Sequence, residues 1–179
     1  NWQAYPKAFA DQAFLDDLSV YFKSRFPVLA NQFDLSDHIV PVPGTREPLH
    51  LLGYCVQGAK QKSAALVTNP FYHAWRAGAL IAGGDIVYIN AAAEHDFMPS
   101  LEELDQDVLA RCNILYLCNP SNPHGKIASA DYLAHALQLA RQFDFLLVVD
   151  ECYIDIWRQT CPVSALEVAI KIASAAQLQ

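Results

Sequence analysis

Short, mostly apolar runs alternate along the chain with longer segments in which apolar residues recur every three or four positions. A run of about five apolar residues is typical of a buried strand, and the longer spacing is typical of a helix that packs along one face. The predicted strands cover residues 38–42, 64–68, 85–89, 114–118 and 145–149. The predicted helices cover residues 10–26, 45–59, 71–82, 129–143 and 164–176, with a further short helix that begins at Ser100.

Residues that favour helix ends support several of these boundaries. Thr45 can cap the helix that follows it, because its hydroxyl is able to accept from a free backbone N–H. The Gly83-Gly84 pair is expected to end the helix before it. Ser100 and Glu103 have the spacing of a capping box, in which each side chain bonds the backbone of the other residue.

Strands that alternate with helices predict an α/β fold. We expect a three-layer α/β/α sandwich with a largely parallel sheet, because helical connections bring successive strands back in the same direction. Ligands of such sheets bind in the crevice outside the carboxyl ends of the strands. The residues that follow the predicted strands are therefore the first candidates for a functional site.

Composition narrows the function classes. The chain has 179 residues, of which 53% are hydrophobic and 17% charged, so it can bury a core. The net charge of -7 argues against a nucleic-acid surface, which needs clustered Lys and Arg. No uncharged stretch is long enough to span a bilayer. The histidines and cysteines lack zinc-site spacing, and no glycine-rich nucleotide motif occurs.

The five cysteines are Cys55, Cys112, Cys118, Cys152 and Cys161. Their number is odd and several lie in strand-like runs, which indicates reduced, buried thiols in a cytoplasmic protein. Cys152 is expected to be such a buried thiol.

The turn PGTRE (residues 43–47) leads into the helix predicted from Thr45. The first N–H groups of a helix have no partner within it, so this arrangement suits a phosphate group. An ordinary capped helix has the same pattern, and this segment alone leaves both interpretations open.

The stiff loop NPSNPHG (residues 119–125) follows a predicted buried strand. A residue before proline is pushed out of the helical region and proline fixes its own φ, so Asn119 and Asn122 are held extended. An amide fixed in this way can donate a hydrogen bond to a ligand oxygen with little ordering cost. The alternative interpretation is a proline-rich turn without a ligand.

The segment VVDECY (residues 148–153) ends the last predicted strand. A buried acid such as Asp150 is costly without a partner, and a cationic ring nitrogen would be one. Tyr153 places a hydroxyl nearby. The alternative is an acid that caps the following turn. At another strand end, Tyr72 can stack on a flat ring.

These features together match the chemistry of pyridoxal phosphate, which has a phosphate, a phenolic oxygen, a π face and a pyridine nitrogen. A carboxylate that faces the nitrogen keeps it protonated, so the ring can accept electrons from a substrate carbanion. We therefore predict this cofactor, and we expect one cleft to gather Thr45, Tyr72, Asn122, Asp150 and Tyr153.

With N-P-x-N-P-x-G at 119–125 and D-E-x-Y at 150–153, the chain resembles the class I/II aminotransferases of the fold-type-I pyridoxal-phosphate enzymes. The resemblance covers essentially the whole chain and implies that residues 1–179 are a partial cofactor-binding large domain. Within the family, the chain looks most similar to the N-succinyldiaminopimelate aminotransferases of lysine biosynthesis. That likeness implies amino transfer between this amino acid and 2-oxoglutarate.

The resemblance implies a role for each site residue. Asp150 would pair with the pyridine nitrogen, and Tyr72 would stack on the ring. Asn122 and Tyr153 would hydrogen-bond the phenolic oxygen.

The resemblance also implies how the phosphate is held. Thr45 and Arg46 would offer backbone groups to it. Tyr5 matches a tyrosine that reaches the phosphate bound by the other subunit, which implies a homodimer.

The family's catalytic lysine follows a serine-containing run that this sequence lacks. Lys171 lies in the middle of a predicted helix and is expected on its surface. The small domain, with its substrate-binding arginine, is not represented either. We therefore expect a chain that is incomplete at both ends, holds no catalytic residue and is inactive alone.

Two alternatives stay open. One is another enzyme of the same fold, such as a carbon–sulfur lyase, because the small domain chooses the substrate. The other is a non-catalytic, aminotransferase-like ligand-sensing domain of a transcriptional regulator. The sequences that flank the chain would discriminate between them.

Overall fold

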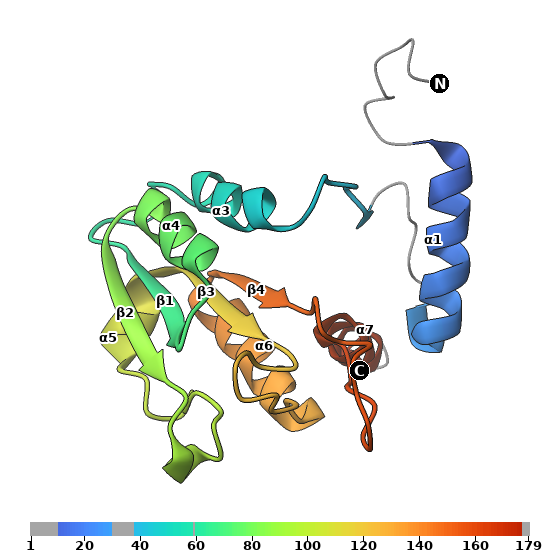
Figure 1. Cartoon of the computed structure of the whole chain (residues 1–179). Coiled ribbons are helices and arrows are strands. Elements are labelled where there is room, and N and C mark those ends of the chain that lie inside the picture. Colours follow the sequence, from blue (N-terminus) through green and yellow to red (C-terminus); the bar gives the residue numbers. More distant parts are fainter. Residues whose placement is uncertain (1–10, 30–37, 59, 177–179) are drawn as a thin grey trace.

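The computed structural model describes residues 11–29, 38–58 and 60–176, and its centre is a four-stranded sheet (Figure 1). The strand order is β2-β1-β3-β4, and every neighbouring pair is parallel. The strands are β1 (Ala64–Asn69), β2 (Asp85–Asn90), β3 (Cys112–Cys118) and β4 (Leu146–Asp150). The predicted α/β fold with a parallel sheet is confirmed.

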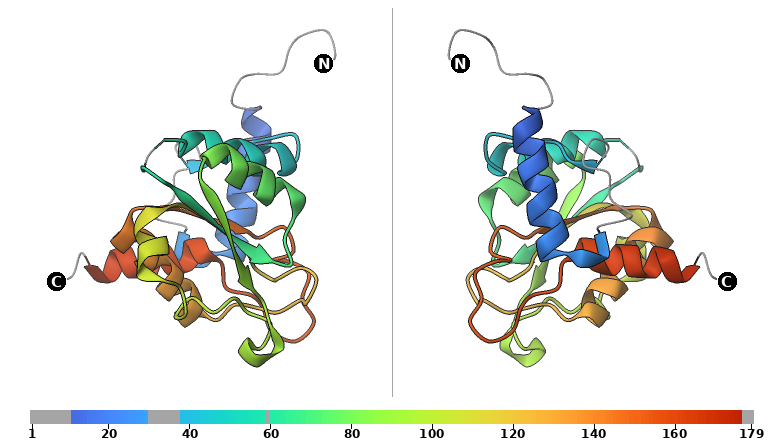
Figure 2. Two further views of the ribbon diagram at one scale, coloured as in Figure 1. Left: turned by 90° about the vertical axis from the view of Figure 1, so that its left-hand side faces the viewer. Right: turned by 90° about the vertical axis from the view of Figure 1, so that its right-hand side faces the viewer.

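Helices cover both faces of the sheet, as the predicted three layers require (Figure 1). Two of them, α3 (Arg46–Cys55) and α4 (His73–Ala82), lie on one face. On the other face lie α5 (Gln106–Arg111) and α6 (Ala130–Phe143). Beyond β4 lie α1 (Gln12–Arg25) and α7 (Ala165–Ala176), which Figure 2 shows on one side of the molecule. Short 3-10 turns complete the described part, η1 (Pro27–Leu29) and η2 (Ala93–His95).

The core alternates across the sheet. Ala65 and Val67 of β1 face α3 and α4, whereas Leu66 faces α5 and α6. All three side chains are fully buried, as expected for a strand that is covered on both faces. Among the described residues, none of the helices is long and apolar enough to cross a membrane.

Most predicted elements form, with small shifts at their ends. Gly83 ends α4 with a φ of +76°, a backbone conformation that favours glycine. Ser129 caps α6 by accepting from the backbone N–H of Tyr132 at 3.1 Å. The helix expected over 45–59 ends at Cys55, and the helix expected from residue 71 begins at His73.

Two predicted elements are wrong. Residues 38–42 form no strand, and Val40 is 76% exposed, because no described strand lies beside this segment to pair with its backbone. The helix expected at Ser100 begins instead at Gln106, where the side chain of Asp105 supplies the cap. The expected capping box does not form, and the Glu103 carboxylate lies 3.4 Å from the His95 ring.

Helix α1 is fastened to the segment that follows β4. The Arg25 guanidinium donates to the Asp155 carboxylate at 2.7 Å and to the backbone oxygens of Ile154 and Pro162. The Tyr21 hydroxyl donates to the same carboxylate at 2.6 Å. These two donors, Tyr21 first and then Arg25, hold the pKa of Asp155 below its ordinary value of 3.8. A charged Asp155 therefore binds α1 to the segment after Tyr153.

Replacing Asp155 by asparagine should weaken this attachment. A lowered pKa stabilises the fold above the ordinary value of 3.8, and this contribution disappears as the pH falls below it. Because Asp155 is about half exposed, we expect Asp155→Asn to lower the free energy of unfolding by about 1 kcal/mol or less near neutral pH. Urea unfolding of the protein measures the difference. The exposed Asp17→Asn on α1 is the control, and an equal loss in both variants would contradict the attachment.

Candidate functional site

A cavity of about 380 Å³ opens at the carboxyl ends of β1, β3 and β4. We call it the strand-end cavity. It forms there because parallel strands end at the same edge of the sheet, where their loops diverge. The residues that line it are Thr45, Pro70, Phe71, Tyr72, Trp75, Cys118, Asn122, Pro123, Asp150, Cys152 and Tyr153.

The five residues expected around one cleft all line this cavity, although they lie far apart in the sequence: Thr45, Tyr72, Asn122, Asp150 and Tyr153. Arg46 is not part of the lining, and its guanidinium pairs with the neighbouring Glu47 carboxylate at 3.0 Å. Tyr5 lies outside the described residues. The grouping that was expected of the strand ends is therefore present.

Asp150 is the last residue of β4, and parallel pairing sets it opposite Cys118 of β3. One carboxylate oxygen accepts from the backbone N–H of Cys152 at 3.2 Å, so the expected turn-capping contact does form. The carboxylate also lines the cavity, where it can meet a cationic group. The strand thus places a carboxyl group in the lining of the cavity.

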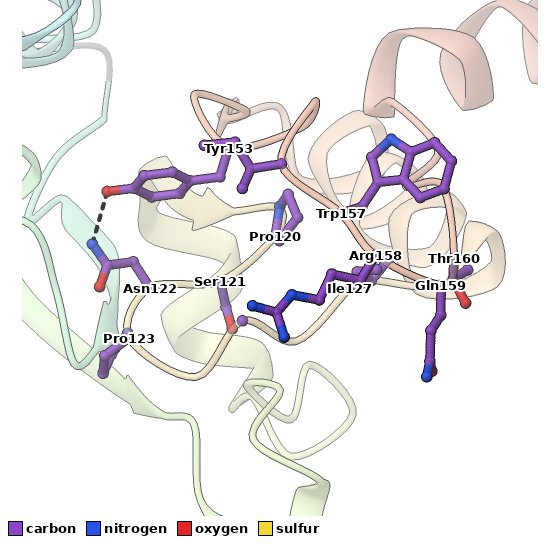
Figure 3. A pocket seen from close by; sticks show the side chains of 12 residues that line it. Pro120, Ser121, Asn122, Pro123, Ile127, Tyr153, Trp157, Arg158, Gln159 and Thr160 are labelled. Atoms are coloured by element: carbon purple, nitrogen blue, oxygen red, sulfur yellow. Dashed lines mark hydrogen bonds between the residues drawn. The ribbon is translucent and has the colours of Figure 1, made fainter.

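The side chains of Asn122 and Tyr153 meet at one point of the cavity wall. They come from the loops after β3 and β4, and the Asn122 amide donates to the Tyr153 hydroxyl at 3.0 Å (Figure 3). Because both groups reach the same place, a single ligand oxygen could bind both. Asn122 Nδ2 keeps a second hydrogen for such an oxygen.

The two asparagines of the NPSNPHG loop have different roles. Asn119 is 1% exposed, donates to the Val163 oxygen at 2.8 Å and accepts from the Ala128 N–H at 3.0 Å. It therefore holds the loop against the rest of the fold. Asn122 is exposed to the cavity and is the one free to contact a ligand.

Tyr72 stands at the start of α4 and forms one wall. Its ring makes an edge contact with Trp75, with the ring centroids 6.3 Å apart. Trp75 in turn stacks on Tyr116 of β3 and is 2% exposed. The buried indole thus supports the tyrosine ring, whose face is available for a flat ligand.

The start of α3 faces the same cavity through Thr45. The Thr45 side chain makes no capping bond to the helix, which corrects its predicted role as a side-chain cap. The first N–H groups of α3 therefore find no acceptor in the Thr45 side chain. Gly44, with a φ of +96°, provides the turn that brings the chain into the helix.

The sequence did not identify Phe71, Trp75 and Cys118 as lining residues, and it placed Cys152 beside the site only as a buried thiol. Cys152 was expected to be buried, but it is exposed to the cavity. Partial burial, followed by the charge of Asp150, raises the pKa of its thiol to about 11, so it is protonated near neutral pH. The available signal was its place between Asp150 and Tyr153, two residues that were already assigned to the site.

The other four cysteines were also expected to be buried, and only some of them are. Burial is confirmed for Cys112 and Cys118, whereas Cys55 and Cys161 are exposed.

No lysine within the described ranges lines the strand-end cavity. Lys171 is exposed on α7, as predicted.

A family model described as aminotransferase class I and II matches residues 1–177. Among curated proteins, the chain is similar to the LL-diaminopimelate aminotransferase of Halothermothrix orenii, with 24% identity over 86% of this chain and 38% of the relative. The enzyme of the same name from Dehalococcoides mccartyi is 27% identical over 84% of this chain and 38% of its own length. The chain thus spans about two fifths of these relatives.

Solved structures show the same fold. The aminotransferase AspB from Helicobacter pylori matches with a TM-score of 0.84 and 28% identity, over 97% of this chain and 44% of that one. An aminotransferase from Neisseria meningitidis matches with a TM-score of 0.84 and 26% identity, over 96% of this chain and 43% of that one. Enzymes of this family depend on pyridoxal phosphate. Since the family model matches almost every residue, the chain belongs to the class I and II aminotransferases.

Proposed function

We propose that the protein to which this chain belongs is a pyridoxal-phosphate-dependent aminotransferase, which moves an amino group between an amino acid and a 2-oxo acid. The observation that carries the proposal is the convergence of Asp150, the Asn122–Tyr153 pair and Tyr72 on one cavity. Each of these groups suits a different part of the cofactor.

The described residues fit the cofactor in type and place. Asp150 would hold a proton on the pyridine nitrogen, because a carboxylate stabilises a cationic N–H. Asn122 and Tyr153 would donate to the phenolic oxygen, and Tyr72 would cover one face of the ring. When bound, pyridoxal phosphate supplies a ring that accepts electrons from the carbon that carries the amino group.

The phosphate would lie at the start of α3. The backbone N–H groups of Thr45 and Arg46 would bind it, since free N–H groups at a helix start attract anions. Tyr5 of a second subunit would complete this site, so the proposal includes a homodimer. The proposal also places the protein in the cytoplasm.

For the substrate we propose N-succinyldiaminopimelate, with 2-oxoglutarate as the amino acceptor, in lysine biosynthesis. Relatives named LL-diaminopimelate aminotransferases support a diaminopimelate skeleton and make the unacylated amino acid the alternative. Residues 1–179 would be part of the cofactor-binding domain. The catalytic lysine and the small domain would be contributed by the rest of the protein.

A transamination assay of the whole protein tests the function. With pyridoxal phosphate bound, we expect glutamate to form from 2-oxoglutarate and the amino donor. Parallel assays with the succinylated and the free diaminopimelate decide between the two donors. Release of ammonia and a 2-oxo acid from a sulfur-containing amino acid, without glutamate, would favour a carbon–sulfur lyase and contradict the proposal. Ligand binding without turnover would favour a sensing domain.

A trapping experiment tests where the reactive lysine lies. Because no described lysine lines the cavity, borohydride reduction of the whole protein with its cofactor should attach the cofactor outside residues 11–29, 38–58 and 60–176. Peptide mass spectrometry locates the modified residue. A stoichiometric adduct on the exposed Lys171 would refute this assignment.

A further inference from the structure

A second and larger cavity, of about 740 Å³, adjoins the strand-end cavity. We call it the outer cavity. Asn122, Pro123 and Tyr153 line both cavities, so the hydrogen-bonded Asn122–Tyr153 pair stands at the boundary between them (Figure 3). A ligand held at this pair can therefore extend from one cavity into the other.

Much of the outer cavity is apolar. Its walls include Ile127 from the loop after β3, and Ile156 and Trp157 from the segment after β4. Ile156 is 75% exposed and Trp157 is 46% exposed, which are large fractions for apolar side chains of this size. A ligand with an aliphatic chain would cover part of this surface, and the burial of both partners would favour its binding.

Among the described residues that line the outer cavity, Arg158 alone carries a charge. Figure 3 shows its side chain extending from the segment after β4 toward Ser121 on the loop after β3. It forms no hydrogen bond or ion pair with any residue that the structure describes, in contrast to Arg25, which binds Asp155 on the same segment. In a chain with a net charge of -7, this guanidinium is available for an anionic ligand.

We infer that the outer cavity binds the substrate side chain and that Arg158 binds a carboxylate at its distal end. This inference rests on the proposed function, which places the reacting end of the substrate in the strand-end cavity. Arginine offers a planar pair of donors that matches a carboxylate, so the contact is directional as well as electrostatic. The preferred substrates are then amino acids and oxo acids with an aliphatic chain and a second carboxylate.

Activity of the whole protein gives the first test. The donors 2-aminoadipate and norleucine have the same carbon chain and differ by the distal carboxylate. We expect Arg158→Gln to lower kcat/KM for 2-aminoadipate about tenfold and to leave norleucine within about twofold. Arg158→Glu should lower kcat/KM for 2-aminoadipate further, because the two carboxylates repel each other. Arg158→Lys should keep part of the preference for 2-aminoadipate over norleucine. The exposed Arg141→Gln on α6 is the matched control.

Binding gives a second test that does not depend on turnover. Trp157 lines the outer cavity, so its fluorescence should respond when a ligand enters. Glutarate and pentanoate form a matched pair of probes with five carbons each. We expect glutarate to bind the wild-type protein more tightly than pentanoate, and Arg158→Gln to reduce this difference about tenfold. The Trp157→Phe variant should lose the fluorescence signal.

The two tests separate this inference from the proposed function. If the protein transaminates and Arg158→Gln changes both donors equally or neither, the carboxylate site is refuted and the function stands. If Arg158→Gln selectively weakens glutarate binding but no amino acid is transaminated, the carboxylate site is supported and the proposed function fails.

Discussion

Replacing Asp150 by asparagine should reduce transamination by about 100- to 1,000-fold and leave the fold intact. The amide has the size of the carboxylate but carries no charge, so it cannot take the role proposed for Asp150, which is to hold a proton on the pyridine nitrogen. Asp150 sits at the end of β4 with its carboxylate on the strand-end cavity, and its one described side-chain contact to a backbone N–H is weak at 3.2 Å. The thermal midpoint should therefore change little. Steady-state kinetics and thermal unfolding of the whole protein measure the two effects.

The matched control lies just before the same strand. Asp144 ends α6, with Phe145 between it and β4, and its φ of +52° is a conformation that asparagine tolerates. Asp144→Asn should keep near-normal activity. Titration with pyridoxal phosphate adds a measurement independent of turnover, because Asp150→Asn should also weaken cofactor binding. Near-normal turnover in Asp150→Asn would show that this carboxylate does not face the ring nitrogen.

The site was predictable where local sequence and sheet geometry agree. Asn122 and Tyr153 follow strands that are apolar enough to identify without a structure, and Asp150 is the last residue of one of them. Parallel strands end at one edge, so residues that follow them must approach one another. Proline restricts the backbone of a short segment to few conformations. The extended backbone at Asn122, which lies before a proline, could therefore be predicted as well.

Other features depend on contacts that no local pattern encodes. Residues 38–42 have strand-like composition, but a strand exists only where a neighbour pairs with it. Ser100 and Glu103 have the spacing of a capping box, but Glu103 finds His95 instead. Trp75 enters the cavity wall because Tyr116 stacks on it from β3. The outer cavity forms between two loops that lie about 30 residues apart in the sequence.

The second large effect is expected where α3 and α4 touch, at Gly53 of α3 and Gly78 of α4. A Cβ added to Gly53 of α3 would lie 2.1 Å from the backbone oxygen of Gly78 in α4. A Cβ added to Gly78 would lie 2.2 Å from the Tyr116 hydroxyl and 2.8 Å from the Leu49 oxygen. These two groups are themselves hydrogen-bonded at 2.9 Å. The helices are therefore in backbone contact at Gly53, and a methyl group on this residue can be accommodated only if they separate.

Gly53→Ala should consequently destabilise the protein by about 1–3 kcal/mol. The sign of this change in stability is diagnostic, because replacing glycine by alanine within a helix ordinarily stabilises the helix by about 0.5–1 kcal/mol. For a protein of this size or larger, the thermal midpoint should fall by roughly 2–4 °C per kcal/mol. Ala77→Gly in α4 measures the ordinary propensity difference at a half-buried position of the same helix pair. A higher thermal midpoint in Gly53→Ala would show that the helices can separate at no cost.

The same substitution should also weaken cofactor binding, because α3 carries the proposed phosphate site at its start. A shift of α3 away from α4 would move Thr45 relative to Tyr72, which precedes α4. Pyridoxal phosphate titration of the folded variant measures this effect separately from stability. Unchanged cofactor affinity in the folded Gly53→Ala variant would mean that the methyl group is accommodated locally, and α3 would then keep its place and its proposed phosphate site.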